Sequence, residues 1–192
     1  SLSRVPLVIF LLKILVLCLV LFTGPASLWA AEGSIIAAQS ASFSGSALTA
    51  GIPLNRGLLA ALYALNQSGG VNGVNVTLAS LDDQYVPATT ASNINTLKAN
   101  YPNMAYFVGL VGSACTAAAQ PLYDAARIPS IGAVTGSSVF RNTFDAYTIN
   151  IRAGYNDEAI AMLRLLVEQR NFKRIAILYQ NDSFGIPSKT VI

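Results

Sequence analysis

Residues 106–121, YFVGLVGSACTAAAQP, join an apolar run to a short stretch of hydroxyl and thiol side chains. Ser113, Cys115 and Thr116 follow the apolar run directly, and the alanines that come next favour a helix. Such a junction suits three roles: a nucleophile, a binding site for an anion at a helix N-terminus, or a plain tight turn. The rest of the sequence helps to choose among them.

Catalytic chemistry finds little support in the residue types. The chain contains no histidine, so a nucleophilic Ser113 or Cys115 would lack the imidazole base that such enzymes use, and a histidine metal site is excluded. Cys115 is better interpreted as a small buried apolar residue. Asp82 and Asp83 are adjacent at a strand end, where neighbouring side chains face opposite ways. No glycine-rich nucleotide loop opens a helix. A serine–lysine or aspartate-based mechanism stays open, although no motif supports it, and we predict neither a cofactor nor a metal.

An anion site at Ser113 remains open after these exclusions. At a junction of strand and helix, a hydroxyl, free backbone N–H groups and the positive end of the helix dipole meet at one place. The alternative is that Ser113 only caps the helix. A second hydroxyl-rich loop at 135–138 follows the next apolar run. Two uncharged hydroxyl loops side by side suit a small zwitterion or an amide better than a polyanion.

The elements that must position these loops alternate regularly. Strands are expected at 34–41, 74–81, 104–111, 128–134, 147–151 and 174–180. Helices are expected at 51–67, 87–100, 114–126 and 156–169. This alternation predicts an α/β fold with right-handed βαβ units, in which a parallel sheet carries helices on both faces. Ligands bind beyond the carboxyl ends of such strands, and five loops are expected there: 42–46, 82–85, 112–116, 135–138 and 181–185.

Composition limits the class of partner. With 53% hydrophobic and 11% charged residues, the chain has material for a core and too little charge for a disordered or nucleic-acid-binding protein. Two of the twelve basic residues, Arg4 and Lys13, lie near the N-terminus, and ten others face nine acidic residues. We expect no nucleic-acid partner. Cys115 would be the single cysteine after export, so no internal disulfide is expected.

The N-terminal segment is predicted to direct export. Arg4 precedes an apolar run at 5–22, and a Gly-Pro pair and small residues follow it. A retained membrane anchor is the alternative, because this run approaches the length of a membrane span. Lys13 near the centre of a spanning helix would cost about 2.5–3.5 kcal/mol, which favours a signal peptide. We expect cleavage near Ala30 and a periplasmic or cell-surface protein.

Four stretches together resemble one known family. LNQSGGVNGVNVTLASLDDQY resembles a helix exit, strand and Asp-Asp-x-Tyr segment of periplasmic (type I) binding proteins for branched-chain amino acids (Leu/Ile/Val). FVGLVGSACTAAAQPLYDAARIPSIGAVTGSSVFR, INIRAGYNDEA and RIAILYQNDSFG resemble later segments of that family, in the same order. The resemblance covers about Ser34 to Gly185. It implies a non-enzymatic protein that captures a small solute, an amino acid or amide-like compound, between two α/β lobes. The expected partner is an ABC transporter permease in the inner membrane.

The resemblance also implies a ligand site. Ser113 matches a hydroxyl that binds the carboxylate of the ligand, and Ala133 and Thr135 match the next loop, which holds the carboxylate and the ammonium. Phe184 matches an aromatic residue contributed by the second lobe. Three further candidates line the cleft: Tyr85, Ser137 and Tyr155. The alternative function is an extracellular ligand-sensing domain of a signalling receptor, which would retain 5–22 as an anchor.

Members of the resembled family are longer than this chain. We therefore predict a signal peptide at 1–30, lobe one at 31–150, and the truncated beginning of lobe two at 151–192, with no helix after Gly185. Two or three hydrogen bonds to charged groups contribute about 3–9 kcal/mol, whereas association costs about 4–15 kcal/mol. One lobe is accordingly expected to bind its solute weakly.

Overall fold

The computed structural model describes residues 33–189, and the predicted signal peptide lies outside them. In the described part of the chain, five parallel strands form one sheet in the order β2-β1-β3-β4-β5. The strands are β1 (Ile35–Ala41), β2 (Val76–Asp82), β3 (Tyr106–Val108), β4 (Ser130–Ile131) and β5 (Thr148–Ile149).

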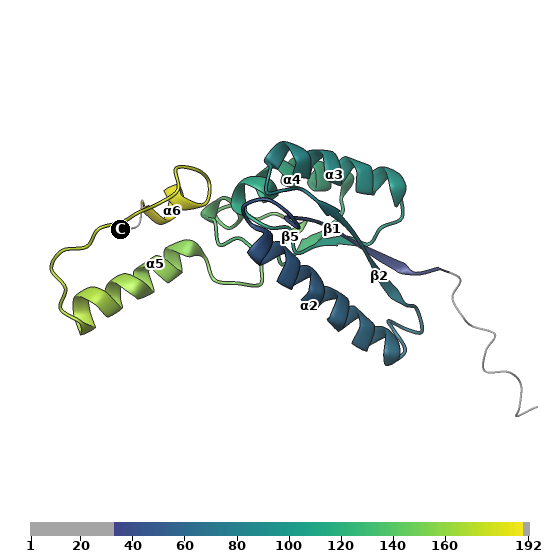
Figure 1. The fold of residues 1–192 in the computed structure, drawn as a ribbon, viewed down its shortest axis with the longest axis horizontal. Coiled ribbons are helices and arrows are strands. Elements are labelled where there is room, and N and C mark those ends of the chain that lie inside the picture. Colours follow the sequence, from purple (N-terminus) through teal and green to yellow (C-terminus); the bar gives the residue numbers. More distant parts are fainter. Residues whose placement is uncertain (1–32, 190–192) are drawn as a thin grey trace, which may run out of the picture. The chain divides into compact units, whose positions relative to one another are not determined.

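Helices follow the strands. They are α2 (Leu48–Gln67), α3 (Pro87–Asn100), α4 (Ser113–Ala126), α5 (Tyr155–Arg164), which continues as a π-helix (Leu165–Gln169), and α6 (Gly185–Lys189), with a 3-10 turn at Ser138–Phe140. In Figure 1, α3 and α4 lie on one side of the sheet and α2 on the other. The α/β fold expected from the sequence is confirmed.

The main core lies between the sheet and the helices α3 and α4. Ile94 and Leu97 of α3, Phe107 of β3 and Tyr123 of α4 belong to one cluster, and each is at most 2% exposed. Fully burying such a side chain contributes about 1.5–3 kcal/mol. Pro87 is the first residue of α3, where its missing N–H leaves no intrahelical bond unmade.

Helix α2 is long and apolar enough to cross a membrane by length and composition alone. Its polar side chains instead attach it to two strands. Asn55 Nδ2 donates to Gln39 Oε1 of β1 at 2.8 Å, and Asn66 Nδ2 donates to the Val76 carbonyl of β2 at 2.8 Å. The Val76 N–H returns a bond to Asn66 Oδ1 at 2.9 Å. Helix α2 connects the parallel neighbours β1 and β2 as the crossover of a βαβ unit, and these bonds hold it against both strands.

The strand order creates a switch point between β1 and β3. The chain passes from β1 to β2 on one side, and then crosses to β3 on the other side of β1. Loops at the carboxyl ends diverge at such a point, which is where open α/β sheets bind ligands. Beyond β3 and β4, Val111 bridges Val134, and the Gly112 N–H donates to the Val134 carbonyl at 3.3 Å. The two hydroxyl loops are therefore held side by side, as the sequence predicts.

Two expectations for the C-terminal part are wrong. The strand expected at 174–180 does not form, and every residue of 171–180 is exposed. A strand requires a neighbour to accept and donate its backbone hydrogen bonds, and none of the described strands pairs with this segment. The short helix α6 forms after Phe184, where no helix is expected. Asp182 Oδ1 accepts the Phe184 and Gly185 N–H groups at 2.8 and 3.3 Å, which satisfies donors at its start.

Candidate ligand-binding site

Two buried hydroxyl groups meet at the start of α4. Ser113 Oγ lies 2.8 Å from Thr135 Oγ1, and both residues are fully buried. Ser113 is the first residue of the helix, while Gly112 occupies the capping position and makes no side-chain cap bond. The interpretation of Ser113 as a helix cap is therefore wrong, because its hydroxyl bonds across to the neighbouring loop instead.

The N-terminus of α4 adds donors beside this pair. In an α-helix the first N–H groups have no carbonyl one turn earlier to bond, and in α4 these belong to Ser113, Ala114 and Cys115. They carry the positive end of the helix dipole, which favours a carboxylate or another anion. The Ser137 N–H donates to Thr135 Oγ1 at 3.1 Å. This bond fixes the orientation of the second hydroxyl.

Two aromatic rings lie close to the hydroxyl-rich loop at 135–138, which we call the hydroxyl loop. Tyr155 and Phe184 pack edge to face, with ring centroids 5.2 Å apart and planes at 88°. The Tyr155 N–H donates to the Gly136 carbonyl at 2.7 Å, and Ser137 Oγ donates to the Ser183 carbonyl at 2.9 Å. The loop that carries Thr135 is thus bonded directly to both segments that carry the rings. A cavity of about 440 Å³ opens beside the rings.

Tyr85 packs against the turn that precedes α4. A Cβ atom placed on Gly112 would overlap the Tyr85 ring, so glycine at 112 permits this close approach. Burial raises the pKa of the Tyr85 phenol, and the nearby Cys115 and Asp182 raise it further. A tyrosine phenol is protonated at neutral pH even at its ordinary pKa, so Tyr85 keeps a proton to donate.

Most of the candidate residues come together, and one does not. Ala133 is 8% exposed and belongs to the hydrophobic core, where its carbonyl accepts the Thr135 N–H at 2.8 Å. Its side chain packs in the core cluster with Phe107 and Leu110. The six remaining candidates lie in the hydroxyl pair, the turn and the ring pair described above: Tyr85, Ser113, Thr135, Ser137, Tyr155 and Phe184.

The disfavoured catalytic groups are occupied elsewhere. Cys115 is fully buried, and burial raises the pKa of its thiol to about 11, so the thiolate is scarce at neutral pH. Asp82 accepts from Ser44 Oγ at 2.5 Å, whereas the buried Asp83 accepts from Ser40 Oγ at 2.9 Å. The two carboxyl groups serve separate networks. The buried role of Cys115 and the separation of the two aspartates are confirmed.

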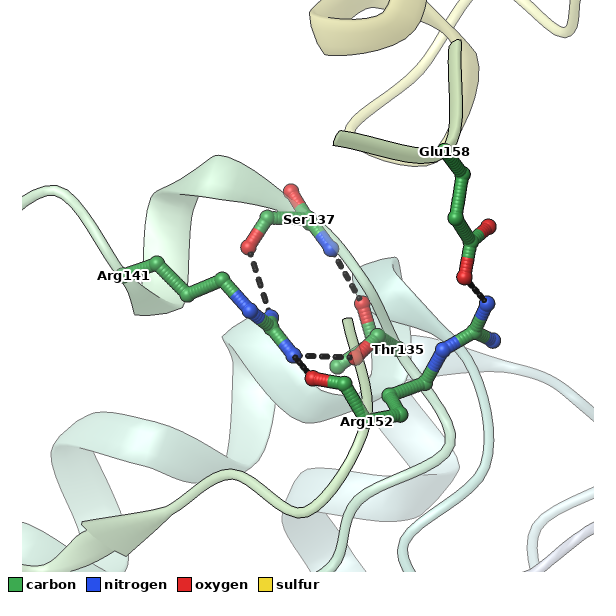
Figure 2. A network of polar contacts seen from close by, with 5 residues as sticks. All are labelled: Thr135, Ser137, Arg141, Arg152 and Glu158. Atoms are coloured by element: carbon green, nitrogen blue, oxygen red, sulfur yellow. Dashed lines mark hydrogen bonds and ion pairs between the residues drawn. The ribbon is translucent and has the colours of Figure 1, made fainter. Parts of the chain in front are cut away.

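Arg141 belongs to the site region, although no motif in the sequence points to it. Its guanidinium donates to the carbonyls of Thr135, Ser137 and Arg152 at 3.2, 3.2 and 3.0 Å, as Figure 2 shows. All three acceptors are backbone carbonyls, so no pattern of side-chain types in the sequence could have predicted these bonds. The remaining signal is weak: a single arginine four positions after Ser137, close to a hydroxyl-rich loop.

Comparison with known proteins places this geometry in context. Residues 36–191 match a family model described as periplasmic binding protein. No curated protein matches the chain. A possible leucine/isoleucine/valine-binding protein from Rhodopirellula baltica SH 1 is 30% identical, with a TM-score of 0.79 over 86% of this chain and 44% of that one. A substrate-binding periplasmic protein from Ralstonia solanacearum is 32% identical, with a TM-score of 0.76 over 82% and 44% of the two chains.

A more distant structure has the same fold. The fatty acid ABC transporter substrate-binding protein from Thermomonospora curvata is 16% identical, with a TM-score of 0.74 over 83% of this chain and 40% of that one. The chain therefore spans less than half the length of these solved structures.

Proposed function

The chain belongs to the periplasmic binding protein family, and from this premise we propose that it binds an amino acid or amide-like solute for delivery to an ABC transporter permease. The family is extracytoplasmic, and its solved members named above are substrate-binding proteins rather than enzymes.

The observation that carries the proposal is the buried hydroxyl pair at the N-terminus of α4. Ser113 and Thr135 follow the neighbouring strands β3 and β4, and their hydroxyl oxygens lie 2.8 Å apart. Two hydroxyls and the helix N–H groups together provide several donors for one carboxylate or amide oxygen. These donors are uncharged, which suits a ligand whose own ammonium balances its carboxylate.

A branched apolar side chain would pack on the rings of Tyr155 and Phe184. Phe184 is 42% exposed, so an apolar ligand group that covers it would remove part of this ring from water. The name of the Rhodopirellula baltica relative, a possible leucine/isoleucine/valine-binding protein, supports the same ligand class. We therefore take L-leucine as the first probe.

The affinity should be modest. Hydrogen bonds to a charged group contribute about 1.5–3 kcal/mol each, and association costs about 4–15 kcal/mol. The hydroxyl pair is already internally bonded, so part of the gain on binding is an exchange of partners. We expect half-saturation above the micromolar range, and a titration must extend to millimolar ligand.

Three probes with the same isobutyl side chain test the proposal: L-leucine, L-leucinamide and isopentylamine. Amide ¹H–¹⁵N spectra of the ¹⁵N-labelled chain should shift at Ser113, Ala114 and Ser137 with the first two. Isopentylamine lacks the carbonyl oxygen and should leave these signals in place. Equal shifts with all three probes, or no shift with leucine at millimolar concentration, would reject the proposal.

A variant pair makes the test site-specific. Ser113→Ala removes one hydroxyl and leaves Thr135 without this partner, so leucine should bind at least about tenfold more weakly. Ser92→Ala on α3 is the matched control, because Ser92 is exposed and its backbone carbonyl, which the substitution keeps, accepts the hydrogen bond from Thr96 Oγ1. Equal affinity in the two variants would remove Ser113 from the site.

A further inference from the structure

Arg141 joins two backbone segments that are separate in sequence. The residue follows the 3-10 turn Ser138–Phe140 and is half-buried. Nη1 donates to the Ser137 carbonyl, and Nη2 donates both to the Thr135 carbonyl and to the Arg152 carbonyl. Figure 2 shows the guanidinium between the hydroxyl loop and the segment that leads into α5.

The first two bonds fix the hydroxyl loop. The carbonyls of Thr135 and Ser137 accept from Arg141, while their hydroxyl groups bond other partners. Thr135 Oγ1 bonds Ser113 Oγ, and Ser137 Oγ bonds the Ser183 carbonyl. The backbone carbonyl of each of these two residues is therefore bonded to Arg141, and its side-chain hydroxyl is bonded to a second partner. Loss of Arg141 would leave the two carbonyls without this donor, so the backbone of the loop would be less restrained.

The third bond reaches the segment that positions the rings. Arg152 lies three residues before Tyr155, and its guanidinium carbon is 5.1 Å from the centroid of the Tyr155 ring. The Arg152 side chain also forms an ion pair with Glu158 of α5. Both side chains of this ion pair are more than one-third exposed, so the pair contributes little by itself. The connection to the loop is the Arg152 carbonyl, which accepts from Arg141.

A guanidinium suits this task better than an ammonium. It is planar and offers five N–H donors in a fixed fork, so a single arginine serves three carbonyls that point in different directions. A lysine has a compact ammonium at the end of a flexible chain, and it does not reproduce this spacing. The Asn150 amide adds a further bond, to the Phe140 carbonyl at 2.9 Å, but it reaches neither Thr135 nor Ser137.

We propose that Arg141 is a positioning residue that holds the hydroxyl loop and the segment leading into α5 in one register, so that the Ser113–Thr135 pair and the Tyr155–Phe184 pair face the same solute. Arg141 itself does not contact the solute. The inference rests on the proposed function for its effect on binding, and on the structure alone for its effect on the loop.

The first test needs no ligand. Amide hydrogen exchange is measured for Ser137 and Tyr155. The Ser137 N–H donates to Thr135 Oγ1 within the loop, and the Tyr155 N–H donates to the Gly136 carbonyl of the loop. Arg141→Lys should speed the exchange of both amides about tenfold, because the lost bonds involve a charged donor. Amides of Ile94 and Leu97 in α3 should exchange as before. Equal acceleration in α3 would show a role in overall stability alone and would overturn the proposal, as would unchanged exchange at Ser137 and Tyr155.

Two arginine controls separate the backbone connection from charge. Arg152→Met removes the ion pair with Glu158 but keeps the carbonyl that Arg141 holds, so exchange at Ser137 should not change. Arg56→Met removes a charge from the exposed side of α2 and should have no effect either. Faster exchange at Ser137 in either control would show that charge, and not the three-carbonyl connection, governs the loop.

The second test measures L-leucine binding to the same variants. Arg141→Lys should raise the dissociation constant about tenfold while the unfolding midpoint in urea stays close to that of the parent. A fall in affinity no greater than that of Arg56→Met would overturn the role in binding. If the parent chain binds no leucine, the proposed function fails, and the exchange measurements still decide whether Arg141 holds the loop.

Discussion

The sheet region, 35–149, and the C-terminal segment, 155–189, use similar apolar residues with opposite results. Phe107 and Leu110 in the sheet region are fully buried, whereas Ile177 and Leu178 in the segment are 42% and 102% exposed. Phe107 also donates its N–H to the Pro129 carbonyl at 2.8 Å, and no described strand gives 174–180 such a partner. The difference shows that an apolar run forms a strand only where neighbouring elements bury its side chains and a neighbouring strand pairs with its backbone N–H and C=O groups.

The largest expected effect contrasts two apolar residues from the two regions. Phe107→Ala should lower the free energy of unfolding by about 3–5 kcal/mol, because it leaves a cavity between the sheet and α4. Leu178→Ala should change it by less than about 0.5 kcal/mol, because this side chain is exposed. Urea unfolding followed by circular dichroism measures both. Similar losses for the two variants would show that the segment is packed as tightly as the sheet.

A smaller contrast lies within one helix of the sheet region. A Cβ on Gly51 would overlap the backbone carbonyl of Ser42, whereas a Cβ on Gly57 would meet no atom within 4 Å. Gly51→Ala should therefore destabilise the fold by about 1–3 kcal/mol. Gly57→Ala should stabilise it by about 0.5–1 kcal/mol, because alanine favours the helix.

Thermal unfolding of the two glycine variants gives the measurement. A drop in melting temperature for Gly51→Ala and a rise for Gly57→Ala would confirm that α2 is packed closely at its first turn and open further along. Two drops of equal size would contradict this description of the helix.

The smallest expected effect concerns two neighbouring carboxyl groups at the edge of the sheet. Burial raises the pKa of Asp83 above 3.8, so the folded state binds this proton more tightly, and Asp83 makes stability rise as the pH falls towards 3.8. Burial also acts to raise the pKa of Asp82, but bonds from Ser44, Gln84 and Phe43 outweigh it and lower that pKa below 3.8. The stability from Asp82 is present above pH 3.8 and is lost as the pH falls through the folded-state pKa.

Urea unfolding at a series of pH values separates the two groups. Asp83→Asn should flatten the dependence above pH 3.8, and Asp82→Asn should flatten it below pH 3.8. Part of each slope should remain, because the pKa of Asp124 is also raised and that of Asp145 is also lowered. Identical profiles for the two variants would contradict the assignment of opposite directions.

Much of the fold could be predicted from periodicity, but strand lengths could not. The predicted strand at 104–111 is reduced to Tyr106–Val108, and the one at 128–134 to Ser130–Ile131. Gly109 and Gly132 follow these short strands with φ of 61° and 64°, and a left-handed backbone interrupts the ladder. An apolar pattern does not reveal which glycine adopts this conformation.

The site could be predicted only in part, for a different reason. Ser113 and Thr135 stand directly after apolar runs, so the parallel topology alone brings their loops together. Arg141 acts on carbonyls four, six and eleven positions away. Backbone carbonyls are present in every residue, so the sequence carries no mark of which ones an arginine will reach.

The hydrogen bond between Ser113 and Thr135 has a consequence for selectivity. On the proposed function, a ligand oxygen that accepts from either hydroxyl must replace the hydrogen bond that Ser113 and Thr135 already make with each other. Bonds to an ionised carboxylate are about twice as strong as bonds between neutral groups, so a carboxylate wins this competition, whereas an alcohol or ether oxygen gains almost nothing. Under the proposed function, the pair would therefore favour a solute with a strongly accepting oxygen over one with a weakly accepting oxygen.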